Sequence, residues 1–380
     1  MKFADEFRES SLARDLSRAL AREAEAIGRP VRIMEVCGGH THAIFKFGLY
    51  DLLPPSVRMI HGPGCPVCVT PRAIVEMAVR LAEQPGIILC TFGDMMRVPG
   101  RTRSLAQARA LGADVRMVYS ALDALEIARR HPDRTVVWFA IGFETTVPGT
   151  ASAVRRARAE HLRNFLLLCN QVTIAPALRA ILEAPDVRVD AFIGPGHVSV
   201  IIGTEPYRFV AEQYRRPVVI SGFEPLDILH SVFQILRQIR SGRPEVAVQY
   251  RRAVRPEGNR LALEVMEEVF EPRDQEWRGL GVIPASGLAL RPPYADMDAL
   301  RVFAGLLPPA LPDPRGCRCG EVLRGVATPP DCPLFGTACT PSYPMGACMV
   351  SAEGACAAYY RYGRSTAAQP AAEVGEIARS

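Results

Sequence analysis

The sequence predicts an α/β protein with two doubly wound parallel-sheet α/β domains and a Cys-rich C-terminal domain. Over residues 31–240, short apolar runs alternate with helical segments, which is the pattern of parallel strands covered by helices on both faces. Beyond residue 279 the chain is rich in Pro and Gly, and it carries six cysteines between Cys317 and Cys356. A segment that has many thiols and little apolar periodicity usually folds around a metal.

Composition excludes several classes of protein. With 380 residues and 48% hydrophobic residues, the chain can form about two or three ordinary cores. The net charge of +5 is scattered, and no apolar run is long enough to cross a bilayer, so we expect neither nucleic acid nor membrane as a partner. The first residues lack an export signal, which favours a cytoplasmic location. In that reducing compartment, eleven cysteines indicate metal ligands or redox groups.

The predicted elements follow one another in a regular order. Residues 4–27 form an amphipathic helix that ends at Gly28. Eight strands are then expected, at residues 31–36, 57–60, 87–92, 115–118, 136–141, 165–168, 191–193 and 218–221, and a helix follows at residues 225–240. A break near residues 131–133 suggests the boundaries: a first α/β domain over residues 1–130, a second over 131–240, and the Cys-rich domain over 241–380.

The first candidate site is Cys37-Gly38-Gly39-His40, directly after the first predicted strand. Ligands collect at the carboxyl ends of parallel strands. The glycines let a ligand approach the backbone, while the thiolate and the imidazole can share a metal, or the imidazole can move the proton of the thiol. The alternative is a buried cysteine beside a histidine that caps a helix.

The second candidate is the pair Cys65 and Cys68, which precedes a helix that we expect to be capped by Thr70, with Pro71 at its first position. A helix N-terminus stabilises a thiolate, and the spacing lets the two sulfurs form and reopen a disulfide. Such a pair can also be half of a zinc site. No second pair stands nearby at zinc-ribbon spacing, so redox or transient iron chemistry is favoured over structural zinc.

The third candidate is the C-terminal group of six thiols, namely Cys317, Cys319, Cys332, Cys339, Cys348 and Cys356. Four thiolates suit a 4Fe-4S cluster or tetrahedral zinc, and the spacing matches neither a zinc ribbon nor a bacterial ferredoxin. Because four ligands leave two thiols over, an iron-sulfur cluster beside a thiol pair explains the group better. A structural domain held by zinc remains the alternative.

Other polar residues stand beside Gly or Pro at predicted strand ends, where they could line a cleft: Asp94, Glu144 and His197. Taken singly, each more often belongs to a turn or a cap. The chain lacks a phosphate-binding loop with its lysine and a GxGxxG motif, so nucleotide cofactors are not indicated.

Together these motifs resemble the family of the hydrogenase maturation factor HypD. The motifs that carry the resemblance lie at residues 37–42, 62–68, 91–100, 142–146, 194–197 and 351–356, and they span the chain from about residue 31 to 363. The resemblance implies an iron-sulfur protein that, with a small HypC-type partner, assembles the Fe(CN)2(CO) unit of nickel-iron hydrogenase. A HypE-type partner would donate the cyanide as a thiocyanate.

The resemblance also implies roles for individual residues. The functional thiols would be Cys37, Cys65 and Cys68, with His40 beside them. By analogy with ferredoxin-thioredoxin reductase, the favoured 4Fe-4S ligands are Cys317, Cys332, Cys339 and Cys348. That choice leaves Cys319 and Cys356 as a redox pair, although Cys317 competes with Cys319, and Cys348 with Cys356, for a ligand position.

A mechanism follows as a hypothesis. Thiolate is the softest protein ligand and suits low-spin iron carrying CN and CO, so Cys37 and a cysteine of the small partner would hold the transient iron. The Cys65/Cys68 pair would exchange electrons. We therefore expect a redox-active assembly factor and not a conventional turnover enzyme. Two alternatives remain: a thiol-disulfide reductase resembling ferredoxin-thioredoxin reductase, and a non-catalytic docking scaffold.

Overall fold

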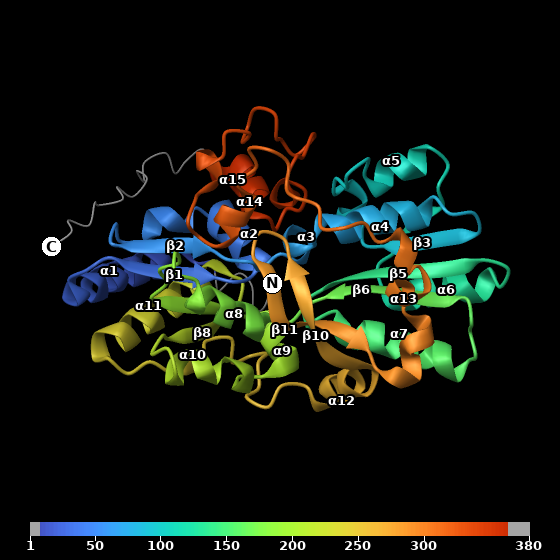
Figure 1. Ribbon diagram of the computed structural model, residues 1–380. Coiled ribbons are helices and arrows are strands. Elements are labelled where there is room, and N and C mark those ends of the chain that lie inside the picture. Colours follow the sequence, from blue (N-terminus) through green and yellow to red (C-terminus); the bar gives the residue numbers. More distant parts are fainter. Residues whose placement is uncertain (1–7, 364–380) are drawn as a thin grey trace.

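A computed structural model describes residues 8–363 and contains two parallel sheets, a β-hairpin and a Cys-rich C-terminal region (Figure 1). Sheet A has the strand order β2-β1-β7-β8-β9, sheet B has the order β4-β3-β5-β6, and β10 pairs with β11 in the hairpin. All neighbouring strands within the two sheets are parallel. The predicted α/β fold class is therefore confirmed.

The strands are β1 Val31–Glu35, β2 Val57–His61, β3 Ile87–Thr91, β4 Val115–Met117, β5 Thr135–Gly142, β6 Phe165–Gln171, β7 Ala191–Pro195, β8 Val218–Ser221, β9 Val246–Val248, β10 Phe270–Trp277 and β11 Gly281–Leu290. The α-helices are α1 Ser10–Ile27, α2 Gly38–Lys46, α3 Pro66–Val69, α4 Arg72–Ala82, α5 Leu105–Ala110, α6 Ala121–Arg130, α7 Val147–Ala159, α8 Ile174–Glu183, α9 Gly196–Ile202, α10 Arg208–Glu212, α11 Pro225–Ser241, α12 Arg260–Val269, α13 Ala299–Val302, α14 Cys319–Leu323 and α15 Ala355–Tyr362. Short 3-10 segments include η3 Gly93–Arg97 and η8 Ala347–Met349.

All eight strands expected from apolar runs are present, and β3, β7 and β8 are buried along their whole length. Helix α1 ends as predicted, with Gly28 in the left-handed conformation at φ 70°. The start of that predicted helix, the N-terminal residues that we used to argue against export, and the end of the third predicted domain lie outside the described residues. Strand β9 and the hairpin were not predicted.

Strand pairing departs from the contiguous division expected at residue 130. Strand β1 pairs with β2 on one side and β7 on the other, so sheet A joins residues 31–61 to residues 191–248. Sheet B occupies residues 87–171, and the expected boundary falls between its strands β4 and β5. The break in composition marks only the turn between α6 and β5, because long-range packing and not local composition selects the partner of each strand.

The core has three parts that follow the two sheets. Apolar residues of α1, α2 and α11 cover one face of sheet A, and those of α6, α7 and α12 cover one face of sheet B. A third cluster joins the facing sides of both sheets to the C-terminal region. That region, orange to red in Figure 1, lies over the first part of the chain, with α15 against α2 and η8 against α3. Every helix within residues 8–363 is too short or too polar to span a bilayer.

Candidate thiol site

Cys37 lies at the carboxyl end of β1, where it is the N-terminal cap of α2. Its N–H donates to Oε2 of Glu35 at 2.9 Å, and its Sγ lies 3.5 Å from Nδ1 of His197. His197 belongs to the first turn of α9, which follows the neighbouring strand β7. Two adjacent parallel strands therefore bring the thiol and the imidazole together.

Glycines allow two other segments to reach the backbone at Cys37. A Cβ added to Gly64 would lie 2.2 Å from the nitrogen of Cys37, and Gly38 N–H donates to the Gly64 carbonyl at 3.2 Å. A Cβ added to Gly38 would lie 2.4 Å from Cβ of Glu353. The chain after β2 and the C-terminal region thus both contact the thiol loop, and side chains on the two glycines would force them apart.

The surroundings of Cys37 favour its protonated form. Burial raises the pKa of the thiol, and the negative charges of Glu353 and Glu35 raise it further. His197 is exposed, but the protein around its ring lowers its pKa to about 4 by reducing its solvation, and the nearby His40 adds to this shift. At neutral pH the His197 imidazole is uncharged, and both pKa shifts keep the proton on Cys37 until a metal binds its sulfur.

His40 is buried, and it is fixed by a contact away from the sulfur. Its Nε2 lies 2.9 Å from the carbonyl oxygen of Gly222, and its ring stacks on Phe223 with centroids 4.8 Å apart. Burial lowers the pKa of His40, so the ring is neutral, and donation from Nε2 leaves a lone pair on Nδ1. That Nδ1 has no hydrogen-bond partner among the described residues, as expected for an open metal-ligand position.

Glu35 is a buried carboxylate that sequence reasoning did not single out. Besides the N–H of Cys37, it accepts a hydrogen bond from the Thr41 hydroxyl, and it lies 2.6 Å from Nδ1 of His61. The Nε2 of His61 in turn contacts the hydroxyl of Tyr50. Glu35 and His61 end the two neighbouring strands β1 and β2, so their places next to the thiol motifs were the available signal.

The cap of the CxxC helix lies one turn earlier than predicted. Cys65 is the N-terminal cap of α3 and Pro66 is its first residue, whereas the Thr70 hydroxyl donates to the Pro66 carbonyl at 2.8 Å and ends that helix. Pro71 precedes α4 without a side-chain cap. The prediction that Thr70 caps a helix starting at Pro71 is therefore wrong, because the fixed φ of Pro66 already starts a helix immediately after Cys65.

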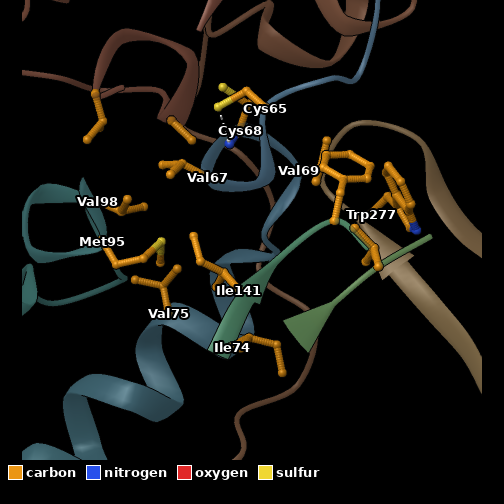
Figure 2. Packing of buried hydrophobic residues seen from close by; sticks show 14 of the residues in the cluster. Cys65, Val67, Cys68, Val69, Ile74, Val75, Met95, Val98, Ile141 and Trp277 are labelled. Carbon is orange, nitrogen blue, oxygen red and sulfur yellow. Dashed lines mark hydrogen bonds between the residues drawn. The ribbon is translucent and has the colours of Figure 1, made fainter. Parts of the chain in front are cut away.

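Cys65 and Cys68 lie close together at one end of a buried apolar cluster, with Cys68 N–H donating to Cys65 Sγ at 3.3 Å (Figure 2). Burial raises the pKa of Cys68, and the neighbouring Cys348 and Cys65 thiols add to this shift. The expectation that a helix N-terminus lowers the pKa fails for Cys68, because α3 has only four residues and burial outweighs its dipole.

Cys348 connects the CxxC pair to the C-terminal thiols. It lies on η8, which packs against α3, and the thiols of Cys319, Cys356 and Cys68 lower its pKa by donating hydrogen bonds to its sulfur. Cys317 lies beside Cys319, since a Cβ on Gly346 would come within 2.8 Å of either sulfur. Sulfur atoms from residues far apart in the sequence thus form one continuous group.

Cys332 and Cys339 occupy loops near this group. Cys332 Sγ lies 3.7 Å from the carbonyl oxygen of Gly316. Burial raises the pKa of Cys339, and the nearby Cys319 and Cys317 thiols add to this shift. Within residues 8–363, no three His, Cys, Asp or Glu side chains converge as they would on a single metal ion.

The three carboxylate and imidazole residues expected at a cleft have different surroundings. His197 faces Cys37. Asp94 lies on η3, near Glu353. Burial raises the pKa of Glu353, and the negative charges of Asp94 and Glu35 raise it further. Glu144 instead accepts a hydrogen bond from the Ile174 N–H at 2.9 Å, at the start of α8. Sequence reasoning did not assign Glu353 to the site, although it stands within the recognised motif at residues 351–356.

Comparisons with known proteins identify the family of the chain. The HypD family model, described as "Hydrogenase formation hypA family", matches residues 11–363. The chain is 55% identical over 372 residues to hydrogenase maturation factor HypD2 of Bradyrhizobium diazoefficiens, which covers 96% of this chain and 97% of that protein. It is 55% identical to HypD of Rhizobium leguminosarum bv. viciae (96% of each chain) and 51% identical to HypD of Escherichia coli (95% of this chain, 98% of that protein). The chain belongs to the HypD family of hydrogenase maturation factors.

Proposed function

We propose that this protein assembles the Fe(CN)2(CO) unit of nickel-iron hydrogenases in the cytoplasm, together with a HypC-type partner and a HypE-type cyanide donor. Membership of the HypD family supports the general role. The observation that carries the finer proposal is the pairing of Cys37 with His197 at the end of two parallel strands. The open Nδ1 of His40 adds a second donor beside that thiol loop.

Iron is the substrate of this site. Binding of iron to Sγ of Cys37 displaces the thiol proton, which leaves to solvent by way of Nδ1 of the exposed His197, and a cysteine supplied by the HypC-type partner binds the same iron. Soft thiolate ligands stabilise low-spin iron(II) with diatomic ligands, so sulfur is the appropriate donor. His40 serves as a neutral nitrogen ligand or orients the thiol loop, since Gly222 fixes its ring.

The C-terminal cysteines fit a 4Fe-4S cluster as the resident cofactor. Each ligand of such a cluster binds a different iron atom, so its thiols need not converge on one point. We propose Cys317, Cys332, Cys339 and Cys356 as the ligands. This set replaces the one expected from the resemblance, because Cys348 contacts Cys68 and is needed for exchange with the CxxC pair. The cluster would supply single electrons.

The remaining thiols then form a relay. The Cys348 thiolate attacks Cys68 in the oxidised Cys65–Cys68 disulfide, and the Cys65 sulfur leaves with the electron pair. Cys319 next displaces Cys68 from the mixed disulfide, so that Cys319 and Cys348 become oxidised while Cys65 and Cys68 become reduced. Two electrons thereby move from the C-terminal region towards the site where the ligands of iron are installed.

The central test replaces Cys37 by Ala and measures infrared spectra of the complex purified anaerobically with the HypC-type partner. We expect the cyanide and carbonyl stretching bands to disappear. Cys90→Ala is the matched control, because Cys90 is a buried core thiol on β3, and its bands should persist. Undiminished bands in Cys37→Ala would refute the iron site.

A second experiment separates the two kinds of C-terminal thiol. Cys356→Ser should lose cluster iron, whereas Cys348→Ser should keep its iron and fail to reduce the Cys65–Cys68 disulfide. The reverse pattern would restore the ligand set with Cys348. Maturation that survives conversion of both Cys65 and Cys68 to Ser would instead favour a docking scaffold.

A further inference from the structure

The chain after β9 packs against the two glycines that directly precede His197 and Phe223. A Cβ added to Gly196 would lie 2.8 Å from Cδ1 of Tyr250, and one added to Gly222 would lie 2.8 Å from Cδ2 of the same ring. These glycines stand at the carboxyl ends of the paired strands β7 and β8. The segment after β9 therefore contacts both loops that bring aromatic rings to the thiol site.

A chain of hydrogen bonds connects this segment to His40. The Gly222 carbonyl oxygen accepts from Nε2 of His40 at 2.9 Å, and the Gly222 N–H donates to Oε1 of Gln249 at 3.1 Å. The Nε2 of Gln249 donates in turn to Oδ1 of Asp227 at 2.7 Å. The two backbone polar groups of Gly222 are thus bonded, one to the imidazole and the other to the amide.

The side-chain amide of Gln249 has one bonded orientation. An ionised carboxylate only accepts hydrogen bonds, so the amide nitrogen faces Asp227 and the amide oxygen faces the Gly222 N–H. Asp227 is fully buried, and Arg252 donates to it from Nη1 at 2.8 Å and from Nη2 at 2.5 Å. The guanidinium also lies over the Tyr250 ring, 4.4 Å from its centroid. The buried ion pair thereby fixes the acceptor that Gln249 presents to the backbone.

The same loop determines which nitrogen of the neutral His40 ring carries the hydrogen. A carbonyl oxygen only accepts, so the contact with Gly222 places the hydrogen on Nε2 and leaves the lone pair on Nδ1. Phe223, the next residue, stacks on the His40 ring and also contacts the ring of His197, with centroids 5.4 Å apart. The position of this loop therefore sets the orientation of the His40 imidazole.

We propose that Gln249 is a positioning residue that fixes the Nε2–H tautomer of His40 through the Gly222 backbone and so keeps the lone pair on Nδ1. Asp227 and Arg252 support it by holding the amide in its bonded orientation. Without the amide, the Gly222 backbone is free to turn, and its carbonyl no longer selects the tautomer. The inference deepens the proposed function, which takes this imidazole as a nitrogen donor or support beside iron, but the tautomer itself is a property of the protein without iron.

The test is long-range proton–nitrogen NMR of the full-length protein labelled with ¹⁵N-histidine, recorded at neutral pH without iron. His40→Gln identifies the His40 signals among those of the seven histidines. Gln249→Met should lower the ratio of the Nε2–H to the Nδ1–H tautomer of His40 about fivefold, as expected for loss of a hydrogen bond. Gln238→Met is the matched control and should keep the wild-type ratio. The Gln238 amide oxygen also accepts from a backbone N–H, that of Glu245 at 2.8 Å, but at the far end of α11.

Infrared spectra of the complex purified anaerobically with the HypC-type partner give a second readout. Gln249→Met should shift or weaken the cyanide and carbonyl bands, and Gln238→Met should not. An unchanged tautomer ratio in folded Gln249→Met would overturn the inference, as would a changed ratio with wild-type bands. If Gln249→Met does not fold, Arg252→Gln decides: a lower ratio supports the inference, and no change overturns it. If the wild type itself lacks the bands, the proposed function fails, whereas the tautomer ratio still tests the role of Gln249.

Discussion

The carboxyl ends of the two parallel sheets carry similar polar residues, but the two edges are used in different ways. At sheet A, Cys37 faces His197 across 3.5 Å, and Nδ1 of His40 has no partner among residues 8–363. At sheet B, Asn170 and Gln171 end β6 and donate hydrogen bonds from their side-chain amide nitrogens to Thr70 and Thr146, while Oε1 of Gln171 has no partner among the described residues. The two edges therefore differ in chemistry: sheet A presents a thiol and imidazole nitrogens, and sheet B presents amide and carboxyl oxygens.

The hairpin accounts for much of this difference. Gln275 on β10 donates to Oδ1 of Asn170 at 3.0 Å, and the Thr173 N–H after β6 donates to the Ser286 carbonyl on β11 at 2.9 Å. Among residues 8–363, glycine-containing loops and Glu353 approach the loop of Cys37, and no strand pair covers it in the same way. The hairpin thus occupies the end of β6, whereas the end of β1 keeps its thiol next to an imidazole.

The largest effect expected from this comparison is that of Gly64→Ala at the edge of sheet A. Its methyl group would meet backbone atoms of Cys37 at 2.2 and 2.4 Å, so the thiol loop must move. We expect loss of the cyanide and carbonyl bands and about 3 kcal/mol of stability, measured by infrared spectroscopy and urea unfolding. Gly149→Ala in α7, where no atom lies within 4 Å, is the control and should be neutral or stabilising. Wild-type behaviour of Gly64→Ala would contradict the tight packing.

The next effect concerns Glu144 beside sheet B. Burial raises its pKa to about 7 from 4.5, so the folded state binds a proton that the unfolded state releases. Stability should fall as pH rises from about 4.5 to about 7, and Glu144→Gln should remove this fall. At about pH 8 the variant should be more stable by about 3 kcal/mol, and at about pH 4 the two should be similar. If the free energies of unfolding of the wild type and of Glu144→Gln, measured in urea, change with pH in the same way, this carboxylate does not titrate as described.

The smallest effect is expected for Asn170→Ala. The variant loses its hydrogen bonds with Thr70 and Gln275 at the covered edge of sheet B, which should cost about 2 kcal/mol in urea unfolding. The infrared bands of the iron unit should be unchanged, because the proposed function places iron at the edge of sheet A. Loss of those bands in a folded variant would erase the distinction between the two edges.

Individual strands of this fold can be predicted from the sequence, but the segments against which they pair and pack cannot. Buried parallel strands form continuous apolar runs, so all eight were visible, whereas the hairpin mixes charged residues with Phe270 and Trp277 and contains Pro272 and a bulge. Cys37, Cys65 and Cys68 were recognisable from their motifs. The contact of Glu353 with the thiol loop and the place of Cys348 beside Cys68 depend on long-range packing, which no local pattern specifies.

The discontinuity of sheet A has a consequence for synthesis of the chain. Arg32 and Asp190, hydrogen-bonded at 2.8 Å, are 158 residues apart, and all of sheet B lies between them. On the ribosome, sheet B can form while β1 and β2 still wait for β7, because N-terminal segments emerge first and distant pairing is slow. The loop of Cys37 therefore lacks its contact with Glu353 until residue 353 has left the ribosome, so the thiol is more accessible to oxidants in the nascent polypeptide than in the folded protein.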